Sequence, residues 1–97
     1  EDEMTQNFVK TFVEKYGDTP NQFAADAYDA MYAIKAAAEK ANLTPDMSVS
    51  DLCEGMKKAM TEVTVDGLTG SITWDAAGEP TKDPKAVVIT DGAYKAM

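Results

Sequence analysis

The hydrophobic positions in the first part of the chain recur with a helical period. Between residues 5 and 16 the apolar side chains are spaced by one, three, one and three residues, which puts them on one face of an amphipathic helix. These side chains are Phe8, Val9, Phe12, Val13 and Tyr16. Thr5 suits the N-terminal cap and Gly17 suits the position just after the last turn. The pattern therefore predicts a first helix over residues 5–16.

A second helix is predicted from a cap at Asn21 to about Ala41. Its expected apolar face contains several alanines, which would let another element approach closely, either a sheet or a second helix. This face consists of Phe23, Ala27, Met31, Ile34, Ala38 and Ala41, with Tyr28 and Tyr32 on a neighbouring ridge. We expect the acidic side chains of the two helices to face solvent; they are Glu14, Asp26, Asp29 and Glu39.

A third helix is predicted after a cap at Ser48 or Ser50. Its expected core face contains Leu52, Cys53, Met56, Ala59, Met60 and Val63. Cys53 is the single cysteine, so no internal disulfide is possible. Because it falls in the apolar stripe, we interpret it as a small core residue rather than a reactive thiol.

The period changes in the last third of the chain. Residues 71–75 alternate as a half-buried strand does, residues 86–90 are typical of a buried strand, and the Asp91-Gly92 turn would return residues 93–97 antiparallel. The chain is thus predicted to be α+β, with three helices followed by short strands and a C-terminal hairpin. Three short strands cannot cover three helical faces, so we expect the chain to be part of a larger layered domain.

Composition narrows the classes of function. With 97 residues there is room for one small domain, and a net charge of −8 disfavours binding to nucleic acid or anionic membranes. The chain starts at Glu1 without a methionine, which we interpret as a processed product or a piece of something longer.

The residues that most enzymes use are scarce. Histidine is absent, which excludes catalytic triads with a histidine base and most catalytic zinc sites. Residues 67–70 lack the spacing, helix and lysine of a phosphate-binding loop. Residues 75–79 lack the alternate oxygen ligands of a calcium loop, so Asp75 is interpreted as a turn residue. The sequence predicts no catalytic residue, no metal ligand, no cofactor and no enzymatic activity.

Three segments together resemble periplasmic substrate-binding proteins of the branched-chain amino acid (Leu/Ile/Val-binding) type. Residues 12–41 read FVEKYGDTPNQFAADAYDAMYAIKAAAEKA and are similar to the family's Tyr-Gly and Tyr-Asp-Ala helices. Residues 65–83 read VDGLTGSITWDAAGEPTKD and are similar to its Gly-x-Thr-Gly-x-Ile-x-Phe-Asp stretch, with Trp74 in the Phe position. Residues 86–95, AVVITDGAYK, resemble its closing hairpin.

The resemblance implies a C-terminal fragment, residues 1–97, of the two-lobed α/β type I fold. Residues 5–64 would be the helical part of one lobe, and residues 65–97 would be strands and a hairpin that crosses toward the hinge. The parent would lie outside the cytoplasm, in the periplasm or on the outer face of the cell membrane. It would capture amino acids or similar small organic solutes by lobe closure and deliver them to the membrane subunits of an ABC importer.

By the same resemblance, Tyr28 is the candidate ligand contact. The alternative is that Tyr28 only packs within the lobe. The groups that hold the solute's α-carboxylate and α-amino groups would lie upstream. Two other interpretations stay open, a free-standing protein-interaction module and a fragment of a receptor or sensor ligand-binding domain. We also expect self-association, because apolar helix faces and strands would otherwise be bare.

Overall fold

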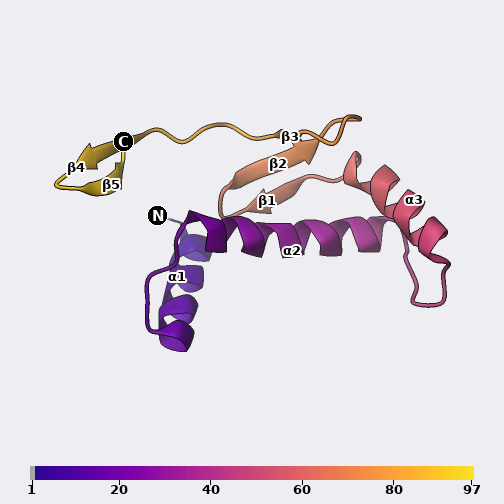
Figure 1. Ribbon diagram of the computed structural model, residues 1–97, viewed down its shortest axis with the longest axis horizontal. Coiled ribbons are helices and arrows are strands. Elements are labelled where there is room, and N and C mark those ends of the chain that lie inside the picture. Colours follow the sequence, from indigo (N-terminus) through magenta and orange to yellow (C-terminus); the bar gives the residue numbers. More distant parts are fainter. Residues whose placement is uncertain (1) are drawn as a thin grey trace.

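The structure is a computed structural model that describes residues 2–97, so Glu1 lies outside the described part. Within it, three helices precede five short strands (Figure 1). The elements are α1 (Glu3–Tyr16), α2 (Gln22–Lys40), α3 (Val49–Met60), β1 (Val65–Gly67), β2 (Gly70–Trp74), β3 (Pro80–Thr81), β4 (Val87–Thr90) and β5 (Ala93–Ala96). The predicted order of helices, short strands and C-terminal hairpin is confirmed.

The first helix begins earlier than predicted because its cap is Asp2 rather than Thr5. The Asp2 carboxylate accepts a hydrogen bond from the Thr5 N–H at 2.7 Å. This backbone hydrogen bond lowers the pKa of Asp2 from 3.8. At the other end, Gly17 has a φ of 73° and its N–H bonds to the Val13 carbonyl, as predicted for a left-handed terminating residue.

The caps of the other two helices are residues that the sequence predicted. The Asn21 side chain accepts from the Ala24 N–H at 3.0 Å. Ser48, and not Ser50, caps α3, accepting from the Asp51 N–H at 3.1 Å. Each cap satisfies a backbone donor that has no partner inside its helix.

Strands β1, β2 and β3 form an antiparallel sheet in that order. Ile72 is buried in β2 between exposed Ser71 and Thr73, which confirms the alternation predicted there. The strands β1 and β3 were not predicted. Both are very short, and β1 contains an Asp-Gly pair that resembles a turn in the sequence.

The small core lies between α2 and the sheet, with α3 packed at the far end of α2 (Figure 1). Its buried apolar residues are Ala33, Ala37, Ala59, Val65, Leu68 and Ile72. Cys53 is exposed, so its predicted place in the core is wrong. The buried residue of that helix is Ala59, and at Gly55 an added Cβ would lie 2.9 Å from Leu43 Cδ2.

The buried face of α2 is not the predicted one. Asp29, Ala33 and Ala37, four residues apart, are at most 4% exposed. Phe23, Met31 and Ile34 from the predicted face are 78%, 66% and 51% exposed. Small side chains let the strands lie close to the helix backbone, and bulky ones at the same positions would hold the sheet away. Side-chain size therefore decided which face the sheet covers.

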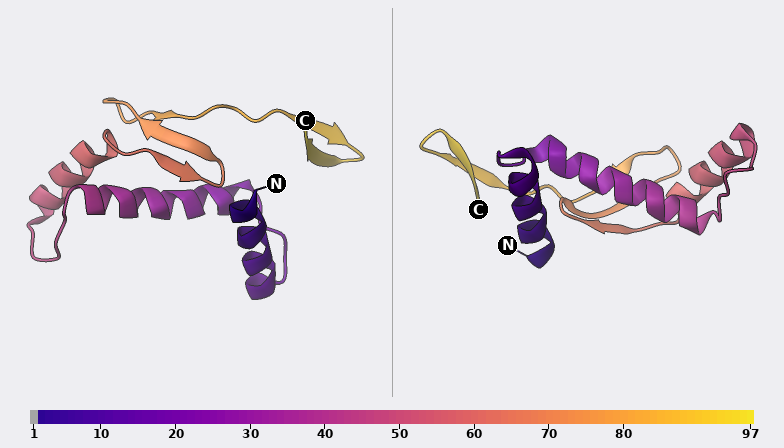
Figure 2. Two further views of the ribbon diagram at one scale, coloured as in Figure 1. Left: turned by 180° about the vertical axis from the view of Figure 1, so that it is seen from behind. Right: turned by 90° about the horizontal axis from the view of Figure 1, so that it is seen from below.

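The hairpin of β4 and β5 stands apart from the β1–β2–β3 sheet at the end of an extended segment (Figures 1 and 2). Its turn residues Asp91 and Gly92 have φ values of 52° and 76°, as the predicted tight turn requires. Residues 86–90 were predicted to be buried, but Val87, Val88 and Ile89 are 45–69% exposed. A hairpin on such a segment has no layer on which to bury these side chains.

The overall shape is elongated. The principal extents are 52 × 30 × 20 Å and the radius of gyration is 16.3 Å. A compact domain of this length has a radius of gyration of about 12.5 Å. Helix α1 and the hairpin both extend beyond the unit formed by α2 and the sheet (Figure 2). Among the described residues, no helix combines the length and the hydropathy needed to cross a bilayer.

Candidate functional site

Tyr28, the predicted ligand contact, lies near the start of α2 and is half-buried. Its ring centroid is 4.9 Å from that of Phe8 on α1 and 5.0 Å from that of Tyr32, one turn along α2. The Tyr28 hydroxyl donates to the Tyr32 hydroxyl at 3.4 Å. This hydrogen bond, followed by desolvation, raises the pKa of Tyr28 above 10.0. The phenol is therefore neutral at physiological pH.

An open groove of about 640 Å³ lies between α1 and α2 on one side of Tyr28. Aromatic rings of α1 form one wall, with Phe8 and Phe12 at 5.9 Å and Phe12 and Tyr16 at 4.7 Å between centroids. Ala24 and Ala27 line the α2 side, where their small side chains leave room. Such a surface suits an aliphatic or aromatic group, because ring faces and other apolar side chains make up most of it.

A second groove, of about 370 Å³, lies on the other side of Tyr28, between α2 and β1. Its lining includes two hydroxyl-bearing rings, Tyr28 and Tyr32, together with residues 64–67. Tyr28 therefore lines both grooves. The structure brings Phe8, from outside the predicted site, against Tyr28.

Asp29, next to Tyr28, is buried where a solvent-exposed side chain was predicted. It was predicted to face solvent, but it is 3% exposed. Its carboxylate accepts from the Leu68 N–H at 2.7 Å, the Thr69 N–H at 2.9 Å and the Thr69 hydroxyl at 2.6 Å. Three donors offset the loss of hydration that burial imposes on a carboxylate. Asp29 thus attaches the β1–β2 turn to α2.

The Gly-Leu-Thr-Gly sequence of this turn is explained by the same contact. A Cβ at Gly67 would collide with the Asp29 carboxylate, at 2.6 Å from Oδ2. Thr69 supplies two of the three donors, and Gly70 has a φ of 127°. The sequence contained an indication that Asp29 is buried, because it lies on the same face of the helix as the small residues Ala33 and Ala37. The donors lie 39 and 40 residues away, however, and only the fold identifies them.

Among residues 2–97, no cluster of potential metal ligands adjoins these grooves. Over residues 2–97, histidine, cysteine, aspartate and glutamate side chains do not gather in groups of three or more that could hold a metal ion. Polar side-chain atoms that are buried in this range all have hydrogen-bond partners. The arrangement presents a mainly apolar surface next to a phenol hydroxyl.

Comparison with known proteins identifies the family. The sequence profile of the periplasmic binding proteins matches residues 1–93. The chain belongs to this family. No curated protein matches it. The periplasmic binding proteins, as their name says, are binding proteins and not enzymes, and the family implies a location outside the cytoplasm.

Solved structures of an ABC transporter substrate-binding protein from Desulfitobacterium hafniense share the fold. Two of them superpose on this periplasmic binding protein with a TM-score of 0.77, at 24% and 25% sequence identity. The second is a complex with Leu. Each match covers 99% of this chain and 27% of the solved one, so the chain spans about a quarter of that length. The predicted resemblance and fold class are confirmed, and the role of Tyr28 and the assignment to lobes stay predictions.

Proposed function

We propose that this chain is part of an extracytoplasmic solute-binding protein that captures an amino acid or similar small organic solute for an ABC importer. The observation that supports it most is the family match over residues 1–93, together with the fold shared with a substrate-binding protein solved with Leu. Capture proceeds by closure of two lobes around the solute, without covalent chemistry. The membrane subunits of the importer are the partners of the loaded protein.

The grooves beside Tyr28 favour a solute with an apolar side chain. Phe8, Phe12 and Tyr28 present ring faces, and Ala24 and Ala27 leave space between them. Burying an aliphatic side chain of the size of leucine's against such a surface is worth about 2 kcal/mol. Tyr28 would contact that side chain, and its hydroxyl would be within reach of a polar group on the solute.

This stabilisation is too small for tight capture by residues 1–97 alone. A dissociation constant of about 1 μM requires about 8 kcal/mol, which needs polar contacts to the α-carboxylate and α-amino groups. We expect those contacts to come from residues outside this segment. Isothermal titration of leucine into the 97-residue chain should therefore show no micromolar binding. Clear micromolar binding would contradict the assignment of the polar contacts to residues outside this segment.

The role of Tyr28 is tested in the polypeptide encoded by the intact reading frame. Tyr28→Ala should weaken binding of an apolar amino acid about 10-fold or more, while Tyr28→Phe keeps the ring face and most of the affinity. Tyr94→Ala is the matched control, because Tyr94 is 78% exposed on the distant hairpin. Equal affinities for Tyr28→Ala and Tyr94→Ala would show that Tyr28 only packs within its lobe.

We also propose that the 97-residue chain associates with itself when it is alone. Exposed apolar side chains on α2 and β4 support this, as does the elongated shape. Sedimentation at increasing concentration should show species larger than the monomer. The substitution Ile34→Gln should reduce them, whereas Lys35→Gln, on the neighbouring exposed position, should not. A purely monomeric chain at high concentration would contradict the proposal.

A further inference from the structure

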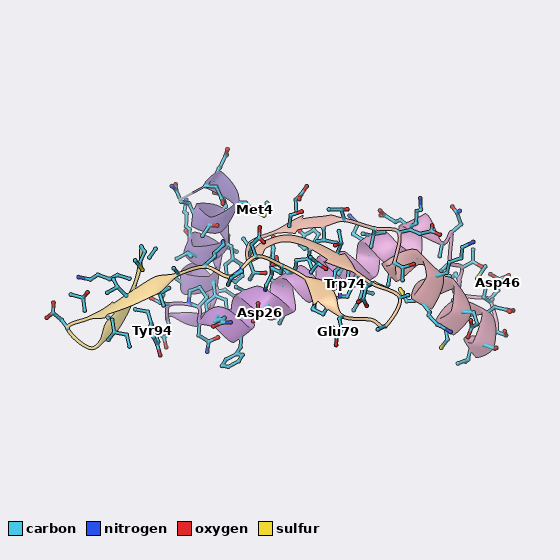
Figure 3. The ribbon with its side chains drawn as sticks, turned by 90° about the horizontal axis from the view of Figure 1, so that it is seen from above. Met4, Asp26, Asp46, Trp74, Glu79 and Tyr94 are labelled. Atoms are coloured by element: carbon cyan, nitrogen blue, oxygen red, sulfur yellow. The ribbon has the colours of Figure 1, made fainter. Side chains whose placement is uncertain are left out.

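Lys82 joins three segments that are far apart in the sequence. Its ammonium donates to the Thr69 hydroxyl in the β1–β2 turn at 3.1 Å and lies 3.6 Å from the Asp26 carboxylate on α2. Figure 3 shows Asp26 on α2 beside the extended segment that follows β3. The side chains of Lys82 and Asp26 are 34% and 39% exposed, so solvent screens their attraction only in part.

Thr69 connects Lys82 to the buried carboxylate of Asp29. Its hydroxyl donates to Asp29 at 2.6 Å and accepts from Lys82 at 3.1 Å, so the single hydroxyl is used in both directions. Lys82 therefore lies close to two carboxylates, one bound directly and one through Thr69. Hydrogen bonds with an ionised partner are stronger than neutral ones, which favours a defined position for the ammonium.

This position matters because Lys82 stands where the chain leaves the sheet. Strand β3 ends at Thr81, and residues 82–86 have no regular structure before β4 begins at Val87. The hairpin itself is exposed over most of its residues. Its direction relative to α2 is therefore set mainly by how the extended segment leaves β3.

We propose that Lys82, held by Thr69 and Asp26, is a positioning residue that fixes the direction of the β4–β5 hairpin relative to α2. In an intact solute-binding protein the same contact would hold one end of the connection toward the hinge. That consequence for lobe closure rests on the proposed function, whereas the contact and its effect on the hairpin do not.

The test measures the distance from α3 to the hairpin in the full 97-residue chain. One spin label is placed on the natural Cys53, which is exposed, and the other on Tyr94→Cys in β5. Labelled chain is diluted with unlabelled chain, so that only distances within one molecule contribute. Pulsed electron paramagnetic resonance then gives the distribution of distances between the labels.

The variant Lys82→Met keeps the aliphatic stem and removes the ammonium. We expect its distance distribution to broaden by on the order of 10 Å, the reach of a flexible segment of five residues. Lys85→Met is the matched control, since it removes a charge from the same segment; Lys85 lines the same cavity and attracts Asp2, but it forms no hydrogen bond or ion pair with Thr69 or Asp26. Its distribution should stay as narrow as that of the parent chain.

Substitutions of Thr69 provide a second test of the same contact. Thr69→Val loses the hydroxyl and should broaden the distribution, and Thr69→Ser restores the hydroxyl and should narrow it again. Urea denaturation of Lys82→Met should give a midpoint close to that of the parent, which separates a change of hairpin direction from loss of the fold. Unchanged distances in Lys82→Met, or equal broadening in Lys85→Met, would overturn the proposal. Neither outcome depends on whether the protein binds a solute.

Discussion

Two hairpins of this chain, β1–β2 and β4–β5, are built in opposite ways. In the β4–β5 hairpin, Asp91 and Gly92 both have positive φ, and the turn matches the natural twist of the two strands. In the β1–β2 hairpin, the residues between the strands, Leu68 and Thr69, have negative φ, so the turn is not of the favoured type. It is held instead by Asp29 from α2. One hairpin is specified locally, and the other depends on a helix about 40 residues away.

This difference shows what a buried carboxylate can contribute to a fold. The two backbone N–H groups of an unfavourable turn need acceptors, and an Asp29 oxygen meets each of them. In return, the turn supplies the donors that allow a charged group to be buried. The β4–β5 turn needs no such partner, and its strands stay exposed.

The largest loss of stability is expected when Asp29 is substituted. Asp29→Ala leaves two backbone donors without acceptors, one buried and one partly buried, and should lower the free energy of unfolding by about 3–5 kcal/mol. A chain of this length has a total stability of about 5 kcal/mol or more, so the variant should keep only the smaller part of it and unfold at a much lower urea concentration. Urea denaturation followed by circular dichroism measures the loss.

The matched control is Glu39→Ala, which removes an exposed acid from the same helix. Glu39 is only part of a surface pair with Lys35 at 3.9 Å, so the free energy of unfolding should change by no more than about 0.5 kcal/mol. If Asp29→Ala and Glu39→Ala denature at the same urea concentration, Asp29 does not support the β1–β2 turn.

A smaller effect is expected from a single methyl group at Gly67. Gly67→Ala places a Cβ against the Asp29 carboxylate and should cost about 1–3 kcal/mol, because the turn must move away from α2. Gly55→Ala is the contrast, since its methyl meets the end of the flexible Leu43 side chain and a helix interior favours alanine by about 1 kcal/mol. Thermal unfolding should separate the two substitutions, and equal destabilisation would contradict the close approach at Gly67.

The locally specified hairpin should respond differently. Gly92→Ala forces a residue with a Cβ into a φ of 76°, which costs about 1–2 kcal/mol. Because the β4–β5 hairpin lies apart from the core, the loss should be confined to it. Hydrogen exchange should show faster exchange in β4 and β5 and unchanged protection in β1 and β2. Loss of protection in β1 and β2 would mean that the two hairpins are coupled.

The smallest effect concerns another local feature, the cap of α1. The pKa of Asp2 is lowered in the folded chain by the Thr5 N–H. The stabilisation of α1 by this carboxylate is therefore present above pH 3.8. It fades as the pH falls through the lowered pKa, because a protonated carboxyl is a weaker acceptor. In the parent chain, the helical signal in circular dichroism should fall at low pH as α1 frays. Asp2→Ala should show the frayed signal already at neutral pH, and identical pH profiles would refute the cap.

Much of the secondary structure was accessible from local patterns. The helical periods, the caps at Asn21 and Ser48 and the Asp91-Gly92 turn are decided by residues within a few positions of one another. The family resemblance was accessible for the same reason, since its motifs are short and contiguous. Tyr28 was singled out by such a motif, although nothing in the sequence placed Phe8 against its ring.

The errors share a physical origin. Hydrophobicity pointed to the stripe of Phe23, Met31 and Ile34 as the buried face of α2, and charge pointed to Asp29 as solvated. Burial depends instead on which surface another element can approach and on which donors that element carries. The sequence by itself determined the three helices, β2, the C-terminal hairpin, the order of these elements and the family. Only the tertiary structure decided that the face of Asp29, Ala33 and Ala37 is covered, because the turn that covers it is distant in the chain and becomes its neighbour on folding.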